Sequence, residues 1–111
     1  MKLPNGHLAV VELKKLMGYS LDPAHRVGRN KALVFRSALG IGKENADLLL
    51  TSLRQAAARE EAVYLETDAY GKHYRIDFQI TGPAGTAIVR SGWCIDPDSE
   101  VPRLATCYVL R

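Results

Sequence analysis

The sequence has few of the residues that build metal centres or disulfide frameworks. Its 111 residues include only two cysteines, Cys94 and Cys107, which have no metal-ligand spacing and form no Cys-x-x-Cys pair. Apolar runs are also short, so a membrane span of roughly 20 apolar residues is excluded, and Met1 is not followed by the apolar core of a signal peptide. No glycine-rich phosphate loop precedes a predicted helix, which argues against a nucleotide cofactor. We expect a soluble, cytoplasmic chain that uses no metal and no cofactor.

Acidic residues are absent from one stretch of the chain, Pro23–Lys43. This stretch holds five basic side chains: Arg26, Arg29, Lys31, Arg36 and Lys43. They give it a charge of +5, whereas the whole chain carries +3, so the other residues carry −2. The positive charge is therefore concentrated. An anionic partner, above all a nucleic-acid backbone, is expected there, and the alternative is a solvated charged surface.

The composition, 47% hydrophobic and 24% charged, is typical of one globular domain over residues 1–111. Its front, about residues 5–58, has the apolar spacing of helices. Three helices are predicted, with these approximate bounds: Asn5–Gly18, Gly28 or Lys31 to Gly40, and Lys43–Ala58. Asn30 is the expected N-cap of the second helix and Gly40 its C-terminal stop.

After Glu61 the spacing of apolar residues changes to the alternation of strands. Four strands are predicted over about residues 62–110: Val63–Thr67, Tyr74–Ile80, Thr86–Ile95 and Leu104–Leu110. If Thr81 lies opposite Thr86, then Asp77 faces Arg90, which pairs opposite charges on one face. We therefore expect an α+β fold in which about three N-terminal helices pack on one face of a four-stranded antiparallel β-meander.

The orientation of the last strand stays open at this point. Thr106 and Tyr108 share one of its faces, because side chains alternate along a strand. If residues 96–102 form a simple connection, Trp93 lies opposite Tyr108 and both candidates face the helices. A bulge or a twisted end near this proline-containing loop changes the assignment.

Several polar side chains are candidates for chemistry. His25 lies just before the basic helix start, and histidine readily takes or gives a proton near neutral pH. Arg26, Arg29 and Lys31 surround a helix N-terminus whose free N–H groups could hold a phosphate. Trp93 could stack a base. The alternatives are a solvated loop histidine, a solvated charged turn and a core tryptophan.

The order of elements and three motifs carry a resemblance to a known family. The motifs are His-x-x-Gly-x-x-Lys-Ala-x-x-Phe from His25 to Phe35, Tyr-Gly-Lys-x-Tyr from Tyr70 to Tyr74, and the closing Arg-Leu-x-Thr-x-Tyr from Arg103 to Tyr108. With Trp93 on the third strand, the chain resembles a small bacterial family of unknown function that recurs in phage-related and polymorphic-toxin proteins. Its layout is similar to the ribonuclease toxins of the barnase, EndoU, colicin and RelE-like group.

This resemblance implies a metal-independent endoribonuclease of bacterial toxin type, which cuts RNA, with tRNA among the candidates, by attack of a 2′-hydroxyl on the phosphate. It implies His25, Lys31, Thr106 and Tyr108 as catalytic residues, with Arg103 as a further phosphate contact. An acidic immunity or antitoxin protein is the implied partner.

Two other functions fit the same residues. The basic stretch could serve a noncatalytic nucleic-acid-binding module, whose affinity would depend steeply on salt. It could instead dock onto an acidic protein surface in a phage or toxin assembly.

Overall fold

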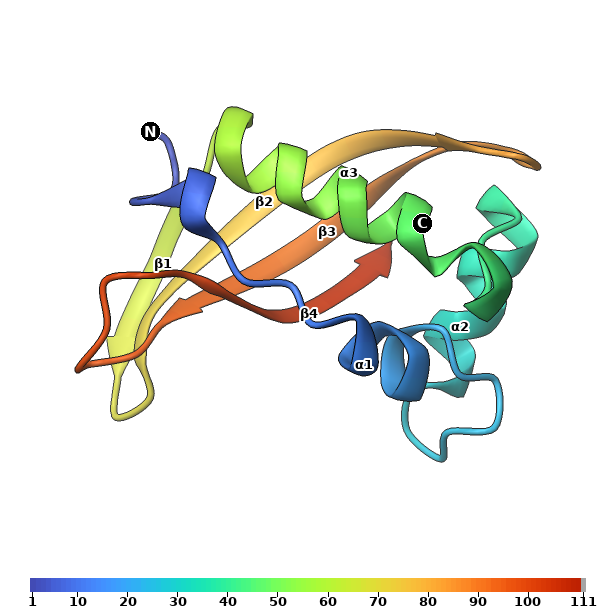
Figure 1. Ribbon diagram of the computed structural model, residues 1–111, viewed down its shortest axis with the longest axis horizontal. Coiled ribbons are helices and arrows are strands. Elements are labelled where there is room, and N and C mark those ends of the chain that lie inside the picture. The colour runs from blue at the N-terminus through green and yellow to red at the C-terminus, as the bar shows by residue number, and fades with distance from the viewer. Residues whose placement is uncertain (111) are drawn as a thin grey trace.

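The computed structural model describes residues 1–110, in which short helices precede four strands (Figure 1). The helices are α1 (Leu13–Lys15), α2 (Arg29–Val34) and α3 (Ala46–Arg59), and the strands are β1 (Val63–Asp68), β2 (Gly71–Gly82), β3 (Gly85–Ile95) and β4 (Arg103–Val109). Two π-helical turns continue α1 and α2, Leu16–Ser20 and Phe35–Leu39. Two 3-10 turns complete the helical part, Gly6–Leu8 and Lys43–Asn45. This order, helices before strands, is consistent with an α+β fold.

The four strands form one antiparallel sheet in chain order, β1-β2-β3-β4. The predicted pairings of Asp77 with Arg90 and of Thr81 with Thr86 are confirmed. Buried and exposed residues alternate along β2, where Ile76 and Phe78 are buried while Asp77 is exposed. One surface of β2 therefore joins the core and the other carries polar side chains.

The predicted layer of about three helices on one face of the sheet is wrong. Asn5 begins only a three-residue 3-10 turn, and α1 is equally short. Between them the chain is extended, and Val10 forms a parallel bridge with Arg103 of β4. Leu8 and Leu13, which fitted the helical spacing, are 53% and 47% exposed. Backbone hydrogen bonds to the edge of the sheet win over helix formation here, because β-branched Val10 and Val11 favour an extended chain.

The second helix begins within the predicted range, but its N-cap differs from the prediction, and a separate turn precedes the third helix. Gly28, and not Asn30, precedes α2. Gly40 ends the π-helical continuation of α2 with a φ of 69°, as expected of a glycine stop. Asn45 Oδ1 accepts a hydrogen bond from the Gly42 N–H at 2.8 Å, so a 3-10 turn with its own cap precedes α3.

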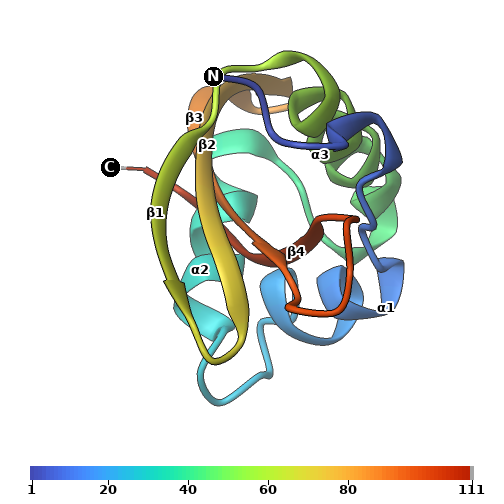
Figure 2. The same ribbon diagram turned by 90° about the vertical axis from the view of Figure 1, so that its left-hand side faces the viewer.

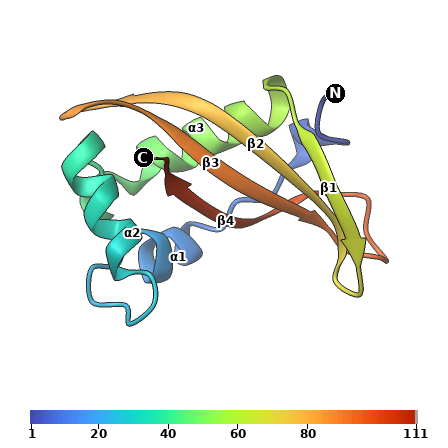
Figure 3. The same cartoon turned by 180° about the vertical axis from the view of Figure 1, so that it is seen from behind.

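The core lies between α3 and the sheet. Leu49 and Leu53 of α3 are fully buried, as are Phe35, Ile76 and Val89. Figure 2 shows β1 and β2 on one side of the molecule and α3 on the other. Figure 3 shows α1 and α2 together at one end, away from the β1–β2 turn. The C-terminal half of β4 runs toward that helical end, so α1, α2 and the end of β4 lie together there.

Gly40→Ala is expected to lower the free energy of unfolding by about 1–2 kcal/mol, because an L side chain is strained in the left-handed region. An added Cβ would also lie 3.0 Å from the Ala84 nitrogen. Gly18→Ala is the control, since nothing lies within 4 Å of its Cβ position. Urea unfolding of both variants measures the difference, and equal stabilities would contradict the assigned turn.

Candidate functional site

A β-bulge in β4 decides where Thr106 and Tyr108 face. The pairs around it are Arg90–Tyr108, Gly92–Thr106 and Trp93–Leu104, so Ala105 is the extra residue. Thr106 and Tyr108 consequently share the surface that carries Arg90 and Asp77, whereas Cys107 is buried. Of the two orientations that the sequence left open, the structure has the bulged one.

Lys31 of α2 lies over two tyrosine rings. Its Nζ is 5.0 Å from the ring centre of Tyr108 and 5.9 Å from that of Tyr19, which belongs to the π-helical turn after α1. A cation over an aromatic face is held by the negative potential of the ring. The three side chains therefore connect α2, the turn after α1 and β4 into one cluster.

His25 joins this cluster through Tyr19, since the two ring centres are 4.6 Å apart in an edge-on arrangement. Its Nδ1 accepts hydrogen bonds from the backbone N–H groups of Val27 and Gly28, both at 3.0 Å. An atom that accepts two N–H bonds carries no proton, so the ring proton is on Nε2. In this arrangement His25 offers a hydrogen-bond donor and no free lone pair. Its predicted role as acid or base stays a prediction, and it requires these two bonds to break.

The same hydrogen bonds change the expected phosphate site at the start of α2. The N–H groups of Val27 and Gly28 point to His25 and not to an open anion site. His25 thus acts as a local cap of the turn that leads into the helix.

Arg90 and Asp77 form a bidentate ion pair across β2 and β3, with both N···O distances 2.9 Å. The Arg90 guanidinium lowers the pKa of the Asp77 carboxyl, chiefly through these hydrogen bonds. Asp77 in turn raises the pKa of Arg90, and the neighbouring Tyr108 adds to this effect. Arg90 is therefore a fixed cation beside the Tyr108 ring.

The basic stretch is partly neutralised by acids that flank it. Arg36 pairs with Glu44, and Lys43 pairs with Asp22 at 3.2 Å. The three remaining cations, Arg26, Arg29 and Lys31, make no ion pair within residues 1–110, and the two arginines are exposed. Positive charge is therefore available next to the Lys31 cluster.

The structure does not bring the other predicted residues to this cluster. Trp93 is only 1% exposed, and its Nε1–H donates to Ser91 Oγ, so it belongs to the core and is not available to stack a base. Arg103 lies at the opposite end of β4 and pairs with Asp96 at 3.0 Å. His73, the one histidine in the four strands, pairs with Asp68 near the β1–β2 turn.

Sequence reasoning missed Tyr19 and gave Arg90 only a structural role. Tyr19 carries no motif of its own, and only the folded chain brings it to Lys31. The bulge had a signal, however. Leu104 and Val109 are apolar residues five positions apart, and both are buried. Two residues separated by an odd number of positions cannot lie on the same face of a regular strand.

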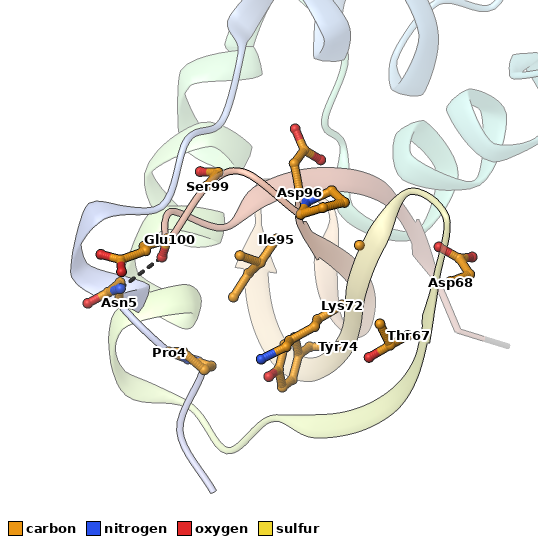
Figure 4. A pocket seen from close by; sticks show the side chains of 12 residues that line it. Pro4, Asn5, Thr67, Asp68, Lys72, Tyr74, Ile95, Asp96, Ser99 and Glu100 are labelled. Atoms are coloured by element: carbon orange, nitrogen blue, oxygen red, sulfur yellow. Dashed lines mark hydrogen bonds between the residues drawn. The ribbon is translucent and has the colours of Figure 1, made fainter.

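A hollow of ≈ 460 Å³ lies beside the β1–β2 turn, at the end of the molecule opposite the Lys31 cluster (Figure 4). Three acidic residues, Asp68, Asp96 and Glu100, line it together with Lys72 as the one basic residue. This charge balance repels a phosphate, so the hollow does not suit the anionic partner that the basic stretch indicates.

Two further properties bear on the type of site. Across residues 1–110, no group of three or more histidine, cysteine, aspartate or glutamate side chains is placed to hold a metal ion. Over the same residues, no helix combines the length and the apolar character that crossing a membrane would require.

One comparison with known proteins gives a family, and another gives a fold. A family model described as domain of unknown function (DUF6883) matches residues 2–111. No curated protein matches the sequence. One similar solved chain belongs to a structure described as "Contact-dependent growth inhibition toxin - immunity protein complex from Klebsiella pneumoniae 342". The match has a TM-score of 0.70 and 21% identity and covers 91% of this chain and 99% of that chain, which shows a shared fold.

His25→Ala is expected to lower the free energy of unfolding by about 0.5–2 kcal/mol, because two backbone N–H groups lose their acceptor. His25→Asn keeps an oxygen acceptor close to the former Nδ1 and should lose less. Urea unfolding of the two variants at pH 8 compares them. Equal losses would show that the Nδ1 hydrogen bonds do not stabilise the turn.

The Asp77–Arg90 pair should make stability depend on pH in acid. The pKa of Asp77 in the folded state lies below its unfolded value of about 3.9. The contribution of the ion pair to the free energy of unfolding is therefore fully present above the unfolded pKa, and it is lost as the pH falls through the folded pKa. Asp77→Asn should therefore show a smaller loss of stability below about pH 4 than the wild type. Asp98→Asn, in an exposed loop, is the control and should lose stability as the wild type does. Thermal unfolding of the wild type and the two variants from pH 2 to 6 measures the difference.

Proposed function

The chain belongs to the DUF6883 family, and on that premise we propose that it is a toxin domain that cleaves RNA without a metal ion. The observation that carries the proposal is the position of Lys31 over the ring of Tyr108. Tyr108 itself lies opposite Arg90 and on the same face of β4 as the hydroxyl-bearing Thr106. Cations and hydroxyl donors gathered on an open surface suit a phosphate whose negative charge grows during reaction.

The reaction assigned to the site is transfer of a phosphoryl group from the 5′-oxygen to the 2′-oxygen within the RNA chain. A 2′-hydroxyl gives up its proton and its oxygen bonds to the adjacent phosphorus, while the bond from phosphorus to the 5′-oxygen breaks and that oxygen takes up a proton. The products are a 2′,3′-cyclic phosphate and a 5′-hydroxyl. Lys31 stabilises the developing charge, and the hydroxyls of Thr106 and Tyr108 donate to phosphate oxygens.

His25 enters this scheme as a donor. With Nδ1 engaged by two backbone N–H groups, its Nε2–H can donate to a phosphate oxygen without any rearrangement. Proton exchange with solvent water then balances the reaction. A base role for His25 would instead require the turn before α2 to open.

A protein partner belongs to the same proposal. The similar fold comes from a complex of a toxin with its immunity protein. In this chain, Arg26 and Arg29 are exposed and make no ion pair within the described residues, so an acidic immunity or antitoxin protein would find a complementary surface there.

A second candidate function, noncatalytic RNA binding, is favoured by one specific observation. His25 is the histidine of the cluster, and its only lone pair is already used by the backbone. A module that binds the RNA backbone needs the cations of the site but no proton acceptor.

Incubation of the purified chain with total RNA and with tRNA in EDTA tests the proposal. We expect fragments that end in 2′,3′-cyclic phosphate, identified by phosphatase and kinase treatment. Lys31→Gln should slow cleavage by about 10²–10³-fold, because a group that stabilises the transition-state charge is lost.

Lys72→Gln removes the same charge at the far end of β2 and should cleave as the wild type. Intact RNA at every concentration of folded protein would remove the enzymatic proposal. Cleavage that disappears in EDTA would contradict its metal-independent form.

A further inference from the structure

We propose that a groove on the open surface of the sheet holds one nucleotide of single-stranded RNA next to the cleaved phosphate, and that Arg75 contacts the phosphate of this nucleotide. The groove has a volume of ≈ 240 Å³ and is lined by residues of all four strands, among them Thr106 and Tyr108. It is thus continuous with the site described above. The inference rests on the proposed function, because it names the neighbouring part of the same RNA.

The shape of the groove suits a flat ring. Gly92, opposite Thr106, lines it without a side chain, and an added Cβ would lie only 3.0 Å from Thr106 Cγ2. On one side lies Tyr108, directed there by the bulge at Ala105. On the other lies Leu65, at the irregular point of β1 between Tyr64 and Glu66. Both bulges therefore turn a side chain toward the groove.

The walls are apolar where a base would lie. Leu65 is 48% exposed and has no partner in the core. An aromatic ring opposite an exposed leucine offers two surfaces on which a base can be packed, and stacking of this kind accepts any base. Base-paired RNA keeps its bases inside the helix, so the groove fits a single strand.

The charges of the groove distinguish its two arginines. The Arg90 guanidinium is held in a bidentate pair by Asp77. Arg75 is half-buried and lies on the same face of β2 as Asp77, two residues before it. It makes no ion pair within residues 1–110. Arg75 is therefore the cation of the groove that is free to bind a phosphate.

Binding of a fluorescent single-stranded 2′-O-methyl decaribonucleotide tests the inference, because a blocked 2′-oxygen cannot attack and only affinity is measured. Arg75→Gln should weaken binding about tenfold and reduce the slope of log affinity against log salt by about 1. Leu65→Glu, at an exposed position, should weaken binding to a similar degree through repulsion of the RNA.

Arg54→Gln is the matched control, since Arg54 is an exposed arginine on α3, and it should bind as the wild type. Circular dichroism confirms that each variant is folded. Wild-type affinity and salt slope in both Arg75→Gln and Leu65→Glu would overturn the inference, as would absence of any binding by the wild type. A 2′-O-methyl duplex that binds as tightly as the single strand would overturn the single-strand assignment.

The outcomes separate the two proposals. Cleavage of RNA by the wild type, with affinity unaffected by Arg75→Gln, would leave the enzyme and remove the groove. Binding that depends on Arg75, with natural RNA left intact, would keep the groove as an RNA site and remove the cleavage.

Discussion

The extra residue at Ala105 is the constraint on which the candidate site depends. Without it, a regular β4 continuing from the Trp93–Leu104 pair would turn Thr106 and Tyr108 toward the core and place Tyr108 opposite the buried Val89. With it, Leu104, Cys107 and Val109 still reach the core, while Tyr108 lies opposite Arg90 and beneath Lys31. One inserted residue thus satisfies burial on one face of the strand and gathers polar groups on the other.

The electrostatics of the site follow from which charges are already paired. Asp77 holds Arg90, and acids flanking the basic stretch hold Arg36 and Lys43. Lys31 and Arg75 make no ion pair within residues 1–110. Lys31 lies over the Tyr108 ring, and Arg75 lines the same groove as Thr106. A phosphate chain could therefore be contacted at two points without breaking a salt bridge. Backbone hydrogen bonds to His25 restrict it to donating, so charge stabilisation carries the proposed chemistry.

The strands and the pairing of β2 with β3 could be predicted because alternation and the turn at Gly82–Gly85 both specify the same register. The third helix had an equally clear apolar face. The first helix could not be predicted correctly, since the spacing of Leu8, Val11 and Leu13 fits a helix as well as an extended segment, and only the hydrogen bonds of Val10 to β4 decide between them. The cluster of Tyr19 with Lys31 depends on tertiary packing and left no pattern in the chain.

The nuclear Overhauser effects of the Tyr108 ring test the central claim most directly. The bulged register predicts contacts from this ring to the side chains of Lys31 and Arg90, which lie on the open surface. Contacts from the Tyr108 ring to the buried side chain of Val89 would show a regular β4, and would remove both the cluster and the function built on it.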